Sequence, residues 1–212
     1  MPLAFATAPH ARTVTTVDDG WYRAITSFAQ RTGWLHRPLE IYTLASIILL
    51  AAMVVYTWWS ARSHADRRAV TAVAWVVLGT ALSTVAGLVL KQIFQEARPC
   101  QAISVATVQA CPGPQDYSFP SDHMTVAVAL AVGLWIVNRK IGLVAIALAA
   151  VEGFSRIYLG QHYPHDVIAA VALSAIVMMG GWYLARGPLT RLIATLERTP
   201  LRPFLTASAD SR

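Results

Sequence analysis

The chain has 212 residues, of which 56% are hydrophobic and only 13% are charged, whereas a typical soluble domain has about a quarter of charged residues. This composition excludes an ordinary soluble domain and indicates a membrane protein. The formal net charge of +6 does not indicate nucleic-acid binding, because the basic residues follow a pattern of membrane topology.

Residues 1–38 are expected to form an N-terminal interfacial segment. From residue 16 onward this segment mixes bulky apolar side chains with Arg23 and Arg31, which is typical of an amphipathic helix lying in the membrane interface. Asp18 and Asp19 suit the first turn of that helix, where the helix dipole favours negative charge. The alternative is a partly ordered tail. A secretory signal peptide is not indicated, since the segment lacks a short apolar core followed by a cleavage site.

Five apolar blocks follow. Residues 41–59, 69–90 and 167–185 contain no charge, and each is long enough to span a hydrocarbon layer of about 30 Å as a helix. Residues 124–138 and 141–154 are shorter, but their polar flanks can extend each helix to the interface. We therefore predict an all-α integral membrane bundle of about five transmembrane helices in residues 39–187, followed by a basic tail in residues 188–212.

The distribution of basic residues predicts the orientation of these helices. Ten of them fall in the loop after the first block, the turn after the third, or the region after the fifth: Arg62, Arg67, Arg68, Arg139, Lys140, Arg186, Arg191, Arg198, Arg202 and Arg212. The positive-inside rule makes this side cytoplasmic. Four arginines of the N-terminal segment do not follow the rule: Arg12, Arg23, Arg31 and Arg37.

Cys100 and Cys111 lie in the loop after the second block, which this topology places outside the cytoplasm. An oxidising compartment permits a disulfide between them. Such a bridge would stabilise the fold by roughly 3 kcal/mol through the closed loop. The alternative is two free thiols.

Several ionisable residues gather at the outward ends of the helices. Lys91 and Arg98 are seven residues apart, about two helical turns, so both side chains project from nearly the same face. The stretch "FPSDHM" resembles a helix start with Ser121 as its N-cap, and the free N–H groups at such an end bind anions. Together with Arg156, these residues would form a phosphate pocket. The alternative is that each cation extends separately to the interface.

Three motifs make the sequence recognisable: "KQIFQEARP" (Lys91 to Pro99), "PSDH" (Pro120 to His123) and "SRIYLGQHYPHD" (Ser155 to Asp166). In order and spacing they resemble the signature of the type 2 phosphatidic acid phosphatase superfamily. The resemblance covers about 75 residues. It implies a helical-bundle hydrolase of phosphoesters or pyrophosphates that needs neither a metal ion nor another cofactor.

The resemblance also implies a role for each motif residue. His162 would be the nucleophile that forms a phosphohistidine, with Asp166 orienting its imidazole. His123 would act first as general acid and then as general base. The expected phosphate-binding residues are Lys91, Arg98, Ser121, Asp122, Ser155 and Arg156.

Asp122 departs from the superfamily pattern, in which glycine is usual. A carboxylate beside a phosphate would repel it unless it pairs with a cation or turns away. The PSDH variant and the short chain look like the bacterial branch that hydrolyses undecaprenyl pyrophosphate. We therefore expect a polyprenyl diphosphatase of the bacterial cytoplasmic membrane, with its active site on the outer face, that recycles carrier lipid for cell-wall synthesis.

The sequence features bear on other functions as well. Phosphatidylglycerophosphate or phosphatidate hydrolysis is the main alternative, because the motifs recognise phosphate and do not specify the lipid tail. A transporter would need polar residues through the whole membrane depth, whereas here they collect at one side. The apolar blocks disfavour a soluble haloperoxidase with a similar anion pocket, and a non-catalytic scaffold would not need both histidines.

Overall fold

The computed structural model describes residues 16–207, and residues 1–15 and 208–212 of the predicted N-terminal segment and tail lie outside the described residues. The described residues form helices and loops without a strand. The elements are α1 (Thr16–Arg31), η1 (Gly33–Leu35), α2 (His36–Ser63), α3 (Arg67–Phe94), α4 (Pro99–Ala102), α5 (Asp122–Val137), α6 (Arg139–Tyr158), α7 (Pro164–Leu196) and α8 (Arg202–Leu205).

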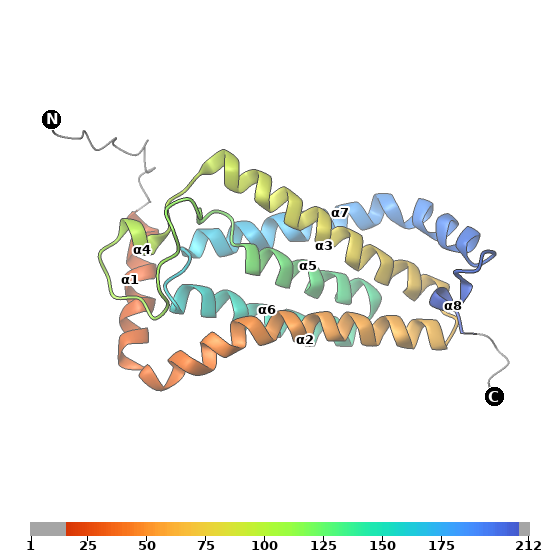
Figure 1. The fold of residues 1–212 in the computed structure, drawn as a ribbon, viewed down its shortest axis with the longest axis horizontal. Coiled ribbons are helices and arrows are strands. Elements are labelled where there is room, and N and C mark those ends of the chain that lie inside the picture. Colours follow the sequence, from red (N-terminus) through yellow and green to blue (C-terminus); the bar gives the residue numbers. More distant parts are fainter. Residues whose placement is uncertain (1–15, 208–212) are drawn as a thin grey trace.

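The bundle consists of α2, α3, α5, α6 and α7, which run back and forth along its long axis (Figure 1). Each contains one of the five predicted apolar blocks, so the predicted all-α membrane bundle is confirmed. Within residues 16–207, four of these helices are long and apolar enough to cross a membrane, and α5 is a shorter apolar helix. The protein is therefore a multi-pass membrane protein. Helix α7 continues to Leu196, past the predicted end of the membrane domain at residue 187.

Helix α5 lies at the centre of the bundle. It packs against α2, α3, α6 and α7, and Ala127, Ala129, Ala131 and Leu134 on its different faces are buried. A helix that is apolar on all sides is stable only when neighbours surround it. The small alanines let these neighbours approach closely, so the central position of α5 follows from its sequence.

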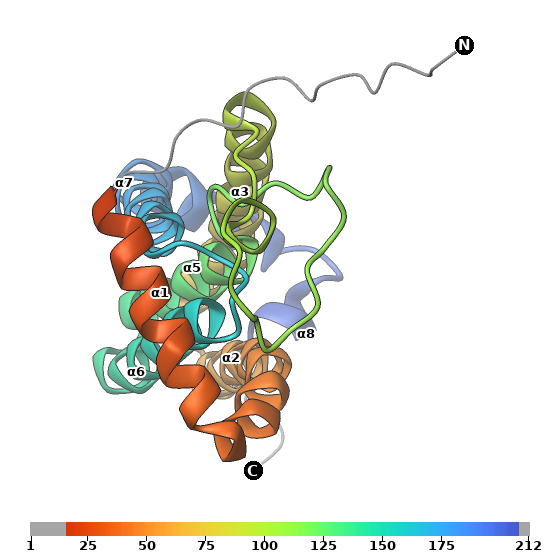
Figure 2. The ribbon, with the colours of Figure 1, turned by 90° about the vertical axis from the view of Figure 1, so that its left-hand side faces the viewer.

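Helix α1 lies across one end of the bundle, nearly perpendicular to the long helices (Figures 1 and 2). One side of this amphipathic helix packs against the bundle, and the other side is exposed. Tyr22 is fully buried and its hydroxyl donates to the carbonyl of Gly160, 3.1 Å away, while Trp21 and Phe28 remain exposed. Near its C-terminal end, Thr32 and the Tyr158 hydroxyl are hydrogen-bonded at 2.8 Å.

The long connection between α3 and α5 covers the same end of the bundle as α1 (Figure 1). It contains the short helix α4, and a disulfide joins Cys100 and Cys111, whose Cα atoms are 5.8 Å apart. Gln161 donates to the carbonyl of Ala110 at 3.3 Å, which links this connection to the loop before α7. The opposite end of the bundle holds the α2–α3 and α5–α6 turns (Figure 1).

Helices α3 and α7 meet closely at Trp75. Its indole ring is buried and its Nε1 donates to the carbonyl of Met178, 3.0 Å away. The ring lies against the backbone of Gly181, where an added Cβ would be 2.5 Å from two ring carbons. The neighbouring Gly180 has no atom within 4 Å of such a Cβ. The lack of a side chain at Gly181 therefore permits the close contact between α3 and α7, whereas Gly180 takes no part in this contact.

These two glycines offer a matched test of the packing. We expect Gly181→Ala to destabilise the protein by about 1–3 kcal/mol, because the added methyl overpacks the contact with Trp75. Gly180→Ala should be neutral or slightly stabilising, since alanine has the higher helix propensity. Thermal unfolding of both variants in one detergent measures the difference. Equal melting temperatures would contradict this account of the α3–α7 contact.

Candidate active site

All nine predicted site residues lie at the end of the bundle that α1 covers. They are Lys91 at the end of α3, Arg98 before α4, Ser121, Asp122 and His123 at the start of α5, Ser155 and Arg156 at the end of α6, His162 between α6 and α7, and Asp166 in the first turn of α7. The alternating helix directions bring these three motifs to one level.

His162 is buried in the short loop that connects α6 and α7. Its Nε2 is 3.2 Å from Nη1 of Arg98. Because a guanidinium can only donate, Nε2 accepts this bond and carries a lone pair. Its Nδ1 is 3.3 Å from Oδ2 of Asp166, so the proton of the neutral ring is assigned to Nδ1. This tautomer directs the lone pair of Nε2 toward a cation.

Burial also controls the charge of His162. It lowers the pKa of the imidazole to about 4, although the hydrogen bond and charge of Asp166 oppose the shift. Low polarity disfavours the charged form of histidine. The ring is therefore neutral near pH 7, as a nucleophile must be.

Asp166 is fully buried and holds the loop around His162. Its Oδ2 accepts hydrogen bonds from the Ser118 hydroxyl and from the backbone N–H of Tyr163, 2.8 Å away. These bonds orient the same oxygen that faces His162. The loop also needs Gly160, whose φ of +83° lies in the left-handed region that side chains disfavour.

Arg98 is held by four contacts. Besides facing His162, it donates to the carbonyl of Gln161 at 3.0 Å, and it donates to both the carbonyl and Oδ1 of Asp116 at 2.9 Å. Burial would raise the pKa of Asp116, but the hydrogen bond and charge of Arg98 and the charge of Lys91 outweigh it and lower the pKa. Asp116 therefore remains an anion.

Lys91 is buried at the last turn of α3 and pairs with two carboxylates. One is Asp122, and the other is Asp116, whose Oδ1 is 3.8 Å from Nζ. Asp122 thus pairs with a cation, one of the two arrangements that the sequence analysis allows. Both carboxylates are half-exposed, so a stronger anion from outside can replace them.

Two of the expected phosphate-binding residues have a buried polar atom without a hydrogen-bond partner within the described residues: Arg156 at Nε and Ser121 at Oγ. A buried unsatisfied donor costs free energy, and a phosphate oxygen would satisfy both atoms. Ser155 differs, because its hydroxyl is buried and donates to the carbonyl of Glu152 in its own helix at 2.8 Å. In this arrangement Ser155 supports α6 rather than facing an anion.

His123 is exposed in the first turn of α5. An open pocket of about 700 Å³ adjoins the cluster and is lined by Leu88, Lys91, Gln92, Gly113, Pro114, Gln115, Asp116 and Asp122. Its lining combines the paired cation Lys91 with apolar Leu88. This pocket opens beside Lys91 and both of its carboxylate partners.

Sequence reasoning missed Ser118 and Asp116. Both lie in the α3–α5 connection, which has no periodic pattern that predicts where its side chains point. The one available signal was their position just before "PSDH", next to a motif rich in cations. His165, which follows the loop of His162, contacts Asp166 and is partly buried.

The geometry supports phosphoryl transfer. A neutral histidine presents its lone pair beside one arginine, two further cations lie nearby, and a second histidine is exposed to solvent. Cations that surround a transferring phosphoryl group stabilise the charge on its oxygens. This arrangement would allow one histidine to act as nucleophile beside an orienting carboxylate, with anion-binding groups and a second histidine for acid–base work.

Comparison with known proteins shows the family of this chain. Residues 69–187, more than half of the chain, match the model of the PAP2 superfamily. The chain is 29% identical over 160 residues to the protein named undecaprenyl-diphosphatase BcrC of Bacillus subtilis (strain 168), a match that covers 74% of this chain and 78% of the relative. It is 30% identical over 124 residues to an undecaprenyl-diphosphatase of Sulfolobus acidocaldarius, with 58% of this chain and 60% of that protein covered.

A solved structure has the same fold. The crystal structure of Aquifex aeolicus LpxE superposes with a TM-score of 0.65 and is 21% identical in sequence. The match covers 80% of this chain and 96% of that chain.

The ionisation of His162 can be measured directly. In histidine-labelled protein we expect nuclear magnetic resonance to show a neutral ring, protonated at Nδ1, with a titration midpoint near pH 4 because burial disfavours the imidazolium. The resonance is assigned by its absence in His162→Gln. A midpoint near the ordinary value of about 6.5 would contradict the buried, neutral nucleophile.

Proposed function

Because this chain belongs to the PAP2 superfamily, we propose that it is a lipid phosphatase that hydrolyses undecaprenyl pyrophosphate, or a similar polyprenyl pyrophosphate, to the monophosphate and inorganic phosphate. The observation that carries the proposal is the pairing of His162 Nε2 with Arg98 at 3.2 Å. It puts a lone pair beside a cation that can hold the phosphoryl group under attack. The likeness in sequence to two named undecaprenyl-diphosphatases supports the substrate class.

In the first proposed step, the terminal phosphate displaces Asp116 and Asp122 from Arg98 and Lys91. His162 Nε2 then attacks the terminal phosphorus, and the bond from phosphorus to the bridging oxygen breaks. His123 gives its proton to that oxygen as the polyprenyl monophosphate leaves. Asp166 keeps the proton of His162 at Nδ1 and stabilises the positive charge that the ring gains.

In the second proposed step, His123 removes a proton from a water molecule that attacks the phosphohistidine. The bond between phosphorus and Nε2 breaks, inorganic phosphate leaves, and His162 returns to its neutral form. Arg156, whose buried Nε has no partner in the described residues, and Ser121 would bind the phosphoryl oxygens in both steps. No metal ion or other cofactor takes part.

We further propose that the protein lies in the bacterial cytoplasmic membrane, with the active site on the outer face. The arginines and lysines of the α2–α3 and α5–α6 turns belong to the opposite end of the bundle, which supports a cytoplasmic location for that end. The disulfide beside the active site is consistent with an oxidising compartment. Helix α1 would then lie at the outer interface. The proposed role is recycling of carrier lipid for cell-wall synthesis.

A substrate panel tests the proposal. Phosphate release by the purified protein in detergent is compared for undecaprenyl pyrophosphate, phosphatidate and phosphatidylglycerophosphate, with a chelator present. We expect a clear preference for the polyprenyl substrate and complete loss of activity in His162→Ala, which lacks the nucleophile. Preference for a glycerophospholipid would keep the mechanism and overturn the substrate, and activity in His162→Ala would overturn the nucleophile.

Ser118 offers a finer test, because its hydroxyl orients Asp166 without belonging to the sequence motifs. We expect Ser118→Ala to lower kcat by roughly tenfold, which corresponds to the loss of one hydrogen bond to a charged group, with little change in KM. Ser174→Ala is the matched control, since Ser174 is also fully buried but donates to the carbonyl of Thr125 within the bundle. Equal kcat values for the two variants would contradict the positioning of Asp166 by Ser118.

A further inference from the structure

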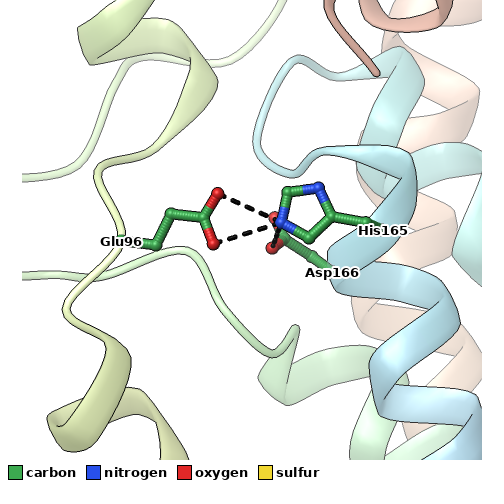
Figure 3. A group of neighbouring side chains, drawn as sticks. All are labelled: Glu96, His165 and Asp166. Carbon is green, nitrogen blue, oxygen red and sulfur yellow. Dashed lines mark hydrogen bonds and ion pairs between the residues drawn. The ribbon is translucent and has the colours of Figure 1, made fainter. Parts of the chain in front are cut away.

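Glu96, His165 and Asp166 form a cluster behind the proposed active site, the His165 cluster. Glu96 lies just after α3, whereas His165 and Asp166 lie in the first turn of α7 (Figure 3). The proposed reaction uses only the Oδ2 side of Asp166, which faces His162. The other side of this carboxylate faces His165, and both oxygens of Glu96 converge on the same ring nitrogen (Figure 3).

The cluster contains more negative charge than its histidine can balance. His165 Nδ1 pairs with Asp18 of α1, while Nε2 faces Glu96 and Asp166. One imidazole therefore meets three carboxylates, and even the protonated ring supplies a single positive charge and two N–H donors. At Nε2, one proton faces two carboxylates, and only Glu96 forms a hydrogen bond with it. A divalent cation between these groups would balance the charge better than this proton does.

The distances suit a small transition-metal ion. Nε2 of His165 is 3.0 Å from Oε1 of Glu96 and 3.3 Å from Oδ1 of Asp166, and one ligand atom of each residue lies within 4.8 Å of the others. Zinc binds imidazole nitrogen and carboxylate oxygen at about 2.0–2.2 Å in tetrahedral geometry. Ligand atoms of such an ion are about 3.3 Å from one another, which is close to the separations from Nε2.

The buried carboxylate of Asp166 independently indicates that a ligand binds at this cluster. The side chain is fully buried, and its Oδ1 has no hydrogen-bond partner among the described residues. It lies 3.3 Å from His165 Nε2 without forming a hydrogen bond. Coordination to a cation would satisfy this oxygen, whose burial without a partner is otherwise costly.

The surroundings of His165 match those of a metal ligand. Zinc-binding histidines usually donate their second ring N–H to a carboxylate, which fixes the tautomer and directs the free nitrogen at the metal. Asp18 is such a carboxylate on Nδ1. The ring is also stacked between Phe119 and Tyr163, with ring centroids 5.7 and 5.3 Å away. These contacts orient the ring before any ion binds.

We propose that Glu96, His165 and Asp166 form a binding site for a divalent transition-metal ion, with Zn²⁺ as the best-fitting ion, and that binding there inhibits the enzyme. The ion would take Oδ1 of Asp166 while Oδ2 still faces His162. Its charge would weaken the stabilisation that Asp166 gives to the imidazole during attack. The ion is thus an inhibitor and not a cofactor, and this effect on activity rests on the proposed function.

Zinc binding is tested without any substrate. Protein freed of its purification tag and of metal is titrated calorimetrically with Zn²⁺ alone. We expect one ion per chain, weaker binding by at least about tenfold in Glu96→Gln and His165→Gln, and a 10–100-fold loss in Asp18→Asn, roughly as found for carboxylates behind metal ligands. His64→Gln is the control, because His64 is exposed at the far end of α2. Equal affinity in wild type, Glu96→Gln and His165→Gln would overturn the site.

The coupling is tested by phosphate release from undecaprenyl pyrophosphate. We expect Zn²⁺ to inhibit the wild type over the concentration range in which it binds, and a chelator to restore activity. Glu96→Gln should keep its zinc-free activity and need at least about tenfold more Zn²⁺ for inhibition. Inhibition at the same concentration in both proteins would overturn the coupling. A wild type with no phosphate release at any zinc concentration would refute the proposed function and leave the zinc site to the calorimetric result. Activity only in the presence of zinc would overturn the claim that the ion inhibits.

Discussion

The carboxylate of Asp166 is the group on which the arrangement of this site depends. It is buried where one helix ends and the next begins, and it meets His162, Ser118, the N–H of Tyr163 and His165. A buried carboxylate is costly unless donors surround it. Groups in the loops that precede α5 and α7 face Oδ2 of this carboxylate and satisfy it, so one residue ties both loops to His162.

The second constraint is the balance of charge at the mouth of the site. Lys91, Arg98 and Arg156 are all buried at one level, where unpaired cations would repel one another. Asp116 and Asp122 lie against the first two of these cations and are half-exposed. The site is therefore assembled around anions that belong to the chain itself. In the proposed reaction, a phosphate group would exchange with these carboxylates rather than enter an uncompensated pocket, so binding would need no large rearrangement of the helices.

Packing in the core of the bundle fixes the positions of the helix ends that carry the site. Helix α5 is enclosed by four neighbours, and close contacts such as Trp75 against Gly181 leave little freedom for the helices to slide. Because α5 begins with Ser121, Asp122 and His123, its register sets the depth of these residues relative to the ends of α3 and α6. Helix α1 closes the same end through Tyr22 and Asp18. The apolar packing and the polar site are thus two parts of one arrangement.

The sequence by itself determined the membrane helices, the grouping of three motifs at one end of them, and the family. Helix spans follow from apolar composition, and residues such as His162 and Asp166 are close because they lie only four residues apart, where a short loop leads into α7. Tertiary structure alone decided that Asp116 pairs with Arg98, that Ser118 orients Asp166, and that Asp18 and Glu96 meet His165. These partners are far apart in the chain and lie in loops or on helices that meet across the bundle end. Their contacts depend on how the whole chain packs, because no local periodicity encodes them.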